Sequence, residues 1–241
     1  MSQNVFGTNQ IKVSIPEAPD ILKSDIKRLS QADFNDNVRQ RILSILNILN
    51  SSGAPNAVNI SPHKFVLQNG FPLEFAFFDN NSTFSIKDRQ NLYTNVFDFA
   101  YDSCVLALRK YGFNMRITAT QICWPTDGHV YANVSGAERF YVGFFKKIAN
   151  DEGTPLHRRV PIEAYSYNQN NAHSKDMSMY TSSIRHYGIY DFKGQPKFSL
   201  DLTVKGRKDA KLVPAKGVVS MPPVTKKAII FLELIKIGKK K

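Results

Sequence analysis

The chain has 241 residues, of which 42% are hydrophobic and 12% aromatic, and its formal net charge is +12. This length and apolar content exclude a wholly disordered protein, because the chain can bury a substantial core. The longest apolar run, residues 228–237, is too short to span a membrane, and the first residues lack the pattern of a secretory signal, so a soluble cytosolic protein is expected. Cys104 and Cys123 are expected to be buried free thiols rather than a disulfide framework.

The first part of the chain predicts an extended arm, two helices and a hairpin. Residues 1–19 are polar and then alternate apolar and polar ahead of two prolines, which is typical of an arm. Helices are expected over residues 20–29 and 30–49, because a capping residue precedes each. Residues 64–79 predict a β-hairpin, since an Asn-Gly turn separates two apolar runs.

The longest helical pattern covers residues 85–112. Ser85 with Asp88 predicts an N-cap, and Gly112 follows the last apolar position. Apolar residues recur at three and four between these ends, and a second apolar stripe leaves only a narrow polar edge. A helix so nearly apolar is expected to be buried. The predicted fold class is therefore α+β, with a single globular core around this long central helix.

Shorter strands and helices follow the central helix. The expected elements are strands over residues 115–124 and 129–134, a helix over 135–148, an extended run over 160–167 and a helix over 177–187.

From Lys197 onward the apolar period changes to two, which indicates strands, the last over residues 228–237. The predicted organisation is an extended N-terminal arm (1–19), an α+β core (20–195) and a basic, β-rich C-terminal segment (196–241).

The positive charge is concentrated near the C-terminus. Residues 196–241 contain twelve Lys and Arg against three acidic residues, which leaves only +3 of the net charge on the preceding residues. A basic segment on a nearly neutral body is typical of a surface that meets a polyanion. A solvated lysine-rich tail is the alternative.

No catalytic motif is found in the sequence. The glycine-rich, metalloprotease, dithiol and serine-hydrolase motifs are all missing, and the five histidines lack metal-ligand spacing. Asp98 and Asp102 lie four apart on the predicted helix and could hold a divalent ion with a third acid, but two acids on a solvated edge are the simpler interpretation. The prediction is therefore a protein that is not an enzyme, without catalytic residues, cofactors or metal.

Basic residues near aromatic residues form the more promising pattern. Arg and Lys contact phosphates, and tyrosines with Trp124 could stack unpaired bases, which favours single-stranded RNA over a duplex. The predicted RNA contacts are Arg109, Lys110, Lys146, Lys147, Arg158, Arg159, Arg185, Lys205, Arg207 and Lys208.

Two short stretches are similar to a known family. They are Ile122-Cys123-Trp124 with Val130-Tyr131, Gly136-Ala137-Glu138-Arg139-Phe140 and Gly143, and further on Arg185-His186-Tyr187-Gly188. They resemble segments of the nucleoproteins of segmented negative-strand RNA viruses, of the bunyavirus type. The resemblance implies a protein that encapsidates RNA and oligomerises through terminal arms.

The predicted function is a viral-type coat or nucleocapsid protein, in the host cytoplasm and the virion, that binds single-stranded RNA and self-assembles. Two alternatives stay open: a matrix-like protein on anionic membrane, and a metal-dependent nuclease using Asp98 and Asp102. The host, the oligomer symmetry and whether the basic clusters share one face are left open by the sequence.

Overall fold

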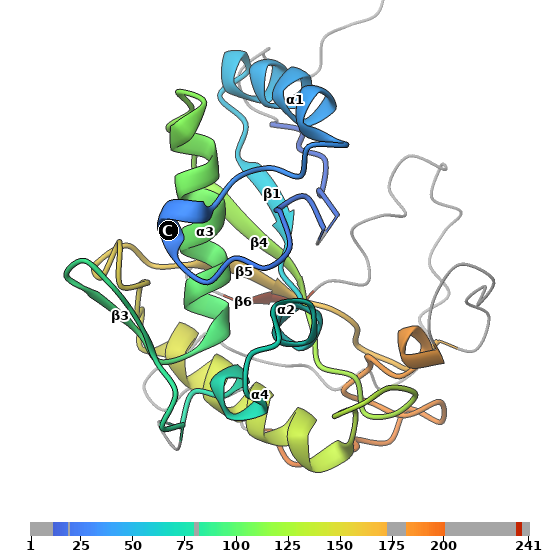
Figure 1. Cartoon of the computed structure of the whole chain (residues 1–241). Coiled ribbons are helices and arrows are strands. Elements are labelled where there is room, and N and C mark those ends of the chain that lie inside the picture. The colour runs from blue at the N-terminus through green and yellow to red at the C-terminus, as the bar shows by residue number, and fades with distance from the viewer. Residues whose placement is uncertain (1–11, 19, 80–81, 173–181, 201–234, 238–241) are drawn as a thin grey trace, which may run out of the picture.

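The computed structural model describes residues 12–18, 20–79, 82–172, 182–200 and 235–237 (Figure 1). Helices and strands alternate along most of this length. The elements are η1 (Leu29–Gln31), α1 (Arg39–Ser51), β1 (Asn56–Asn59), α2 (Pro62–Asn69), η2 (Leu73–Ala76), β2 (Ile86–Asp88), β3 (Asn91–Tyr93), α3 (Val96–Lys110), β4 (Ile117–Ile122), α4 (Val134–Ala149), β5 (Glu163–Ser166), η3 (Ser182–Arg185) and β6 (Ile235–Ile237).

The main sheet has the strand order β1-β4-β5-β6. β1 pairs with β4 and β4 with β5 in parallel, whereas β6 pairs antiparallel with β5. Helices connect the parallel strands, as parallel pairing requires a long crossover. The carboxyl ends of β1, β4 and β5 therefore meet at one edge of the sheet.

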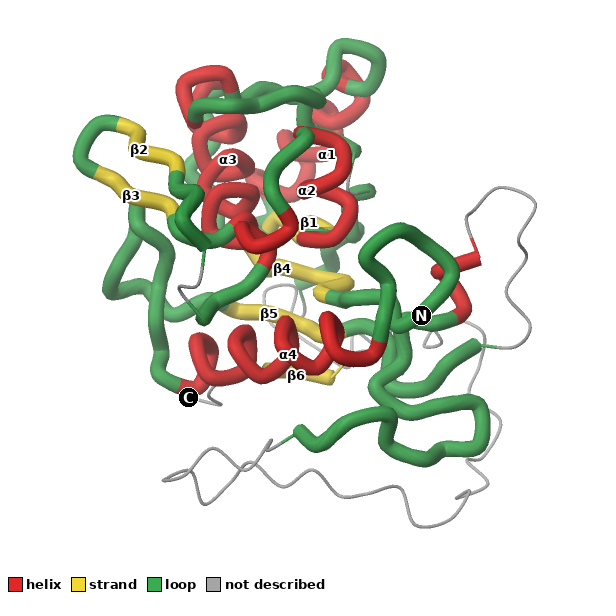
Figure 2. Tube along the Cα trace, turned by 60° about the horizontal axis from the view of Figure 1, so that its bottom comes forward, coloured by secondary structure: helices red, strands yellow, loops and turns green. Residues whose placement is uncertain are grey.

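The two faces of this sheet differ in chemistry. Val58, Ala119 and Ala164 belong to the core cluster that α2, α3 and α4 cover. Figure 2 shows β1, β4 and β5 side by side, with α2 and α3 next to β1 and α4 next to β5 and β6. Asn59 and Thr120 are register partners and lie on the opposite face, where the Thr120 hydroxyl donates to the Asn59 side-chain oxygen at 2.7 Å. The hydrophobic core is thus between the sheet and its helices, and the opposite face is polar.

The long helix is shorter than expected and is not the single centre of the fold. α3 begins at Val96, because Asn95 is its N-cap and accepts the Asp98 backbone N–H at 2.9 Å. The β2–β3 hairpin occupies the place of its first turns, and Arg89 in the hairpin turn has a φ of 54°. The prediction of a helix from Ser85 is wrong, because the residues before Asn95 pair as strands. The C-terminal end is confirmed within a residue or two, with Gly112 at a φ of 81°.

The predicted hairpin over residues 64–79 is wrong, because this stretch forms α2 and η2. Pro62 begins α2, where its missing N–H costs nothing. Gly70 ends it in the left-handed conformation, with a φ of 60°. The Asn-Gly pair is therefore the end of a helix and not a hairpin turn.

The two predicted early helices are replaced by one, α1, and the helix over residues 20–29 is wrong. Asp33, expected near the start of the second helix, is instead buried and ties this segment to the end of α3. It accepts hydrogen bonds from the Lys110 ammonium at 2.7 Å and the Tyr111 hydroxyl at 2.8 Å. Because the Asp33 carboxylate makes these contacts, it does not stabilise the start of a helix.

In the second half, β4, α4 and β5 confirm a strand, a helix and an extended run, whereas residues 129–133 form turns and not a strand. Asn133 caps α4 by accepting the Gly136 N–H at 2.7 Å. The helix predicted over 177–187 is described from residue 182 onward, where Ser182–Arg185 form the short 3-10 helix η3 and residues 186–187 are not helical. The strands predicted after 200 lie outside the described residues except for β6, and residues 197–200 are not a strand. The three-segment division stays a prediction.

Cys104 and Cys123 are buried and are not joined by a disulfide bond, which confirms the expectation for the thiols. In the described ranges no helix has the length and apolar character needed to cross a membrane.

Glu17 is a buried carboxyl group at the margin of the main sheet. Its backbone pairs with β1, donating to Ala57 at 2.9 Å and accepting from Asn59 at 3.0 Å. Within the described residues neither side-chain oxygen accepts a hydrogen bond in good geometry. Burial raises the pKa of Glu17 to about 7, and the neighbouring Asn56 amide offsets only part of this.

Stability is therefore expected to fall as the pH rises through the range in which Glu17 ionises. Below its ordinary pKa of 4.5 the carboxyl is protonated in both states, whereas above about 7 the folded state holds a buried charge that costs ~3 kcal/mol. Glu17→Gln should remove this loss, which urea unfolding at pH 4.5 and pH 8 would show. An unchanged pH difference in Glu17→Gln would contradict the assignment.

Candidate active site

The carboxyl edge of the parallel strands carries polar side chains on three successive strands. Asn59 ends β1, Gln121 lies one residue before the end of β4, and Asn168 follows β5 closely. Clefts and sites of parallel α/β sheets form at this edge, because the loops that follow the strands converge there. This edge is therefore the candidate binding site.

Gln121 is aimed by an irregularity in the sheet. Ala119 pairs with Ala164 and Ile122 with Ser166, so β4 holds one more residue than β5 between these pairs. Gln121 takes up the extra length with a φ of 52°, a region that non-glycine residues rarely adopt. Its side chain is half-buried, whereas the other residues of β4 are buried. Such bulges often re-aim a side chain next to a functional site.

Trp124 supports the loop that follows β4. Its ring is fully buried and stacks on Phe140 at 5.4 Å between centroids, with Phe77 at 5.2 Å. The indole N–H donates to the Tyr131 carbonyl at 3.2 Å. On the other side, His63 Nε2 donates to the Val130 carbonyl at 2.6 Å. Two aromatic side chains thus fix the loop over residues 123–133 beside the strand ends.

Acidic side chains are missing from the strand ends themselves. Residues 58–61, 120–124 and 165–169 contain neither Asp nor Glu. After β1 the first acidic residue is Glu74, which pairs with Arg139 at 2.6 Å. After β4 it is Asp127, which accepts the Gly128 N–H at 2.6 Å. Within the described ranges no group of three His, Cys, Asp or Glu could hold a metal ion.

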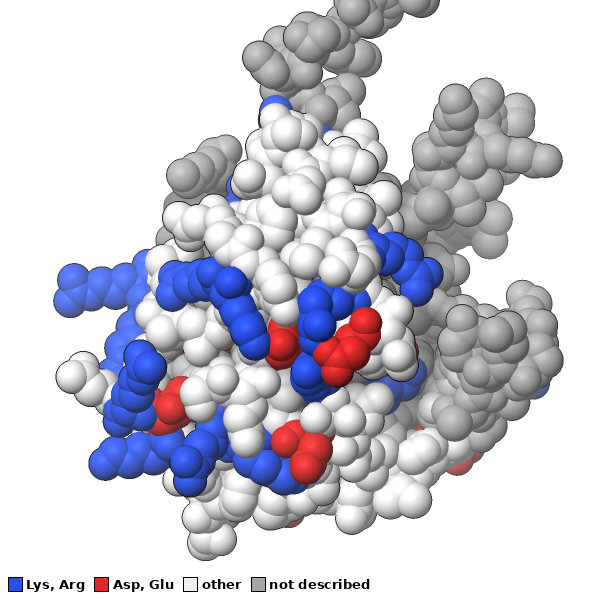
Figure 3. Space-filling model, turned by 45° about the horizontal axis from the view of Figure 1, so that its top comes forward, with Lys and Arg blue, Asp and Glu red and all other residues white. Residues whose placement is uncertain are grey.

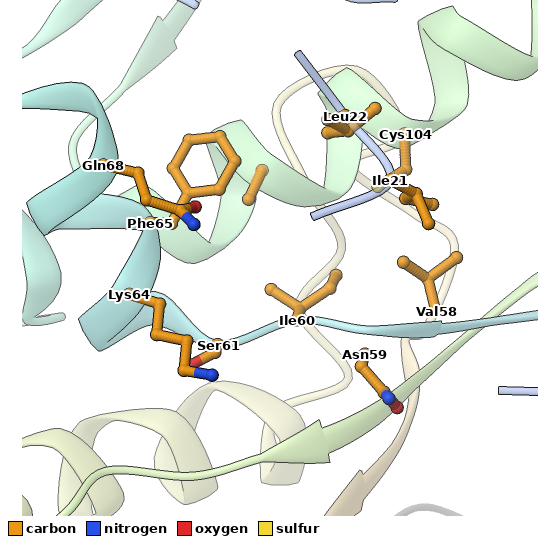
Figure 4. Close-up of a pocket in the computed structure, with 11 residues that line it drawn as sticks. Ile21, Leu22, Val58, Asn59, Ile60, Ser61, Lys64, Phe65, Gln68 and Cys104 are labelled. Carbon is orange, nitrogen blue, oxygen red and sulfur yellow. The ribbon is translucent and has the colours of Figure 1, made fainter. Parts of the chain in front are cut away.

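A small hollow lies on the helical side of β1, and its volume is too small for a substrate. Figure 4 shows Val58 and Ile60 directed toward Phe65 and Cys104, while Asn59 points the opposite way. The hollow has room for about one water molecule. The carboxyl edge therefore remains the candidate site.

The predicted RNA contacts do not form one surface at this edge. Arg109 and Lys110 are exposed at the end of α3, and Arg158 and Arg159 are exposed before β5. Lys147 is buried, although the residue before it is exposed. Three further positions, Lys205, Arg207 and Lys208, lie outside the described residues, and Arg185 ends η3.

Asp98 and Asp102 are buried structural groups and not an open metal site. Asp98 pairs with the Lys147 ammonium at 3.2 Å. Asp102 accepts the Tyr93 hydroxyl at 2.8 Å and the Leu156 N–H at 3.0 Å. Burial raises the pKa of both carboxyl groups.

Alternating parallel strands and helices, with polar side chains gathered at the carboxyl ends of the strands, define the class of α/β enzymes to which the barrel hydrolases belong. The model of the family "Glycosyl hydrolases family 17" matches residues 5–202. The chain belongs to this family.

Two curated relatives from Arabidopsis thaliana are similar over most of the chain. Glucan endo-1,3-beta-glucosidase 5 is 36% identical over 211 residues, 87% of this chain and 42% of the relative. Glucan endo-1,3-beta-glucosidase 8 is 34% identical over 218 residues, 89% of this chain and 44% of the relative. The chain thus spans less than half of the length of either relative.

A solved structure extends the similarity to the fold. CJP38, a β-1,3-glucanase and allergen of Cryptomeria japonica pollen, superposes with a TM-score of 0.71 at 27% identity, covering 80% of this chain and 59% of the other. The fold is accordingly the TIM-barrel-like fold of family 17, and the prediction of a single core around a central helix with a basic, β-rich C-terminal segment is wrong.

The family corrects the functional predictions as well. The resemblance to viral nucleoproteins is wrong, because the family model and the relatives are those of glycosyl hydrolases. The nucleocapsid, matrix and nuclease functions, the RNA partner, self-assembly through arms and the cytoplasmic and virion location are overturned with it. The expectation that the chain is not an enzyme is also wrong, since the family is one of enzymes.

Sequence reasoning missed Asn59, Gln121 and Asn168. One signal could have indicated them: each is an amide within two residues of the end of a short strand, on the three strands that pair in parallel. That pattern places polar groups at one edge of a parallel sheet.

Proposed function

We propose that this chain acts on β-1,3-glucan and binds the sugar chain at the carboxyl edge of β1, β4 and β5. The observation that carries the proposal is Gln121, an amide held in a strained conformation at this edge by the extra residue in β4. The relatives named glucan endo-1,3-beta-glucosidases support the choice of β-1,3-glucan.

The amides suit a sugar ligand. Each side-chain amide has two N–H donors and an accepting oxygen, so it can pair with hydroxyl groups in either direction. Neutral amides also lose less hydration free energy on binding than charged groups do. Asn59, Gln121 and Asn168 would therefore bind and orient sugar hydroxyls.

Hydrolysis of a glycosidic bond generally uses two carboxyl groups on either side of the bond. The strand ends contribute amides, so a carboxyl pair in the working enzyme would come from other segments, of which the loop with Asp127 is the nearest along β4. Binding and cleavage should therefore be measured separately.

Gln121→Gly is expected to weaken binding of laminarin, a β-1,3-glucan, by about three- to tenfold, because a lost hydrogen bond typically costs ~0.5–1.5 kcal/mol. The same change should leave stability equal or higher, since glycine adopts a positive φ without strain. Calorimetry with laminarin and urea unfolding on the same samples would measure both effects.

Gln40→Ala, at an exposed position on α1, is the control and should change neither quantity. Release of reducing ends from laminarin is the parallel assay for cleavage. Absence of both laminarin binding and cleavage in the unmodified chain would overturn the proposed function. Equal binding by the unmodified chain and Gln121→Gly would remove Gln121 from the site.

A further inference from the structure

A basic hollow lies at the opposite end of the sheet from the candidate active site. It forms where β4 and β5 begin, and Ile117 and Glu163 at the starts of these strands line it. The last turn of α3 contributes Arg109, and the loop before β5 contributes His157. The carboxyl-edge site uses none of these residues.

Most charged side chains in and beside the hollow are arginines that are exposed to solvent. Arg109 donates to His157 Nε2 at 2.7 Å, so the histidine is neutral, and burial together with Arg109 lowers its pKa. Arg116 is 69% exposed, and its ion pair with Glu163 is long, at 3.8 Å. Arg158 and Arg159 are exposed in the adjoining loop. Figure 3 shows how Lys and Arg side chains gather on the end of the molecule where α3 ends.

The uncharged residues that line the hollow indicate which kind of polyanion it could bind. Val160 and Pro161 are exposed and offer an apolar surface to the C–H face of a sugar ring. Apart from the His157 imidazole, Tyr101 is the one aromatic side chain among the described residues that line the hollow, and its hydroxyl donates to the Ile117 carbonyl at 3.3 Å. Single-stranded nucleic acid typically needs several aromatic faces for its bases. The lining therefore suits a charged carbohydrate better than RNA.

We propose that this hollow is a binding site for an acidic polysaccharide, with Arg109 and Arg116 pairing with the carboxylates of its uronic acid units. Guanidinium groups match carboxylates with two parallel hydrogen bonds, which lysines cannot do. The two sites lie at opposite ends of the same strands, so an acidic chain held in the hollow leaves the carboxyl edge open to glucan. The choice of a polysaccharide rests on the proposed function.

The test compares two double variants that remove the same charge. Arg109→Gln with Arg116→Gln is expected to weaken binding of polygalacturonate by about tenfold or more. Arg41→Gln with Lys146→Gln, at exposed positions on α1 and α4, should leave the affinity within about twofold. Affinity of the unmodified chain should fall with added salt, since exposed charges are screened. Neutral dextran is the negative control.

Equal losses in the two double variants would overturn the proposal, because net charge alone would then explain binding. Tighter binding of single-stranded RNA than of polygalacturonate, dependent on the same two arginines, would overturn the carbohydrate assignment. Laminarin binding, measured on the same samples, separates the two proposals. A chain that binds polygalacturonate through Arg109 and Arg116 but not laminarin keeps this site and loses the proposed function.

Discussion

Lys147→Met is expected to lower the free energy of unfolding by about 3–5 kcal/mol, because it leaves the Asp98 carboxylate buried without its ion-pair partner. The two side chains are 8% and 7% exposed and their charged atoms are 3.2 Å apart. The loss should be larger at pH 8 than at pH 5. Burial already raises the pKa of Asp98, and without the lysine the carboxyl can avoid the cost only by remaining protonated. Urea unfolding at both pH values measures this.

Lys146→Met is the matched control for this change. Lys146 is exposed on the same turn of α4, and its replacement should change stability by less than about 0.5 kcal/mol. The double variant Asp98→Asn with Lys147→Met should recover most of the loss, since it removes the buried charge. If Lys147→Met and Lys146→Met behave alike, the buried pair does not stabilise the fold.

Trp124→Ala is expected to cost about 3–5 kcal/mol of stability, the usual range for truncating a buried large aromatic side chain. Its ring is fully buried against Phe140 and Phe77. Binding of laminarin should be lost at the same time, because the indole N–H holds the loop over residues 123–133 through the Tyr131 carbonyl. Circular dichroism during urea unfolding and calorimetry with laminarin measure the two effects.

Trp124→Phe separates packing from the hydrogen bond. It keeps an aromatic ring in the core and removes the indole N–H, so we expect a loss smaller than that of alanine by at least about 1 kcal/mol. Equal losses in the two variants would show that the ring contacts of Trp124 contribute little.

The elements that the sequence predicts well are those whose apolar pattern has one structural interpretation. β4 and α4 belong to this group, since a run of apolar strand formers and a capped amphipathic helix each fit a single element. α2 does not, because the Asn-Gly pair that ends it, Asn69-Gly70, serves a hairpin turn and a helix end equally. The choice between them depends on packing of Phe65 against Phe71 and Phe99, which connects distant segments.

The candidate site was harder to predict than the fold. The direction of the Gln121 side chain depends on the register between β4 and β5. The sequence around Gln121 does not determine this register. The net positive charge of the chain led to the wrong prediction of RNA binding for a related reason. Net charge describes a surface and not a fold or a reaction, and Lys147, counted among the RNA contacts, is buried against Asp98. Sequence position alone does not say which side of a helix faces the core.

Trp124 is the single tryptophan of the chain, and this makes its fluorescence a spectroscopic reporter of one place. All indole emission originates beside the carboxyl ends of the strands, whereas the far-ultraviolet circular dichroism signal is dominated by helices spread over the molecule. Regions of one protein can open with different free energies. A fluorescence transition that precedes the dichroism transition would therefore signal local opening of the carboxyl edge of the sheet, and coincident transitions would place this edge and the helices in one cooperative unit.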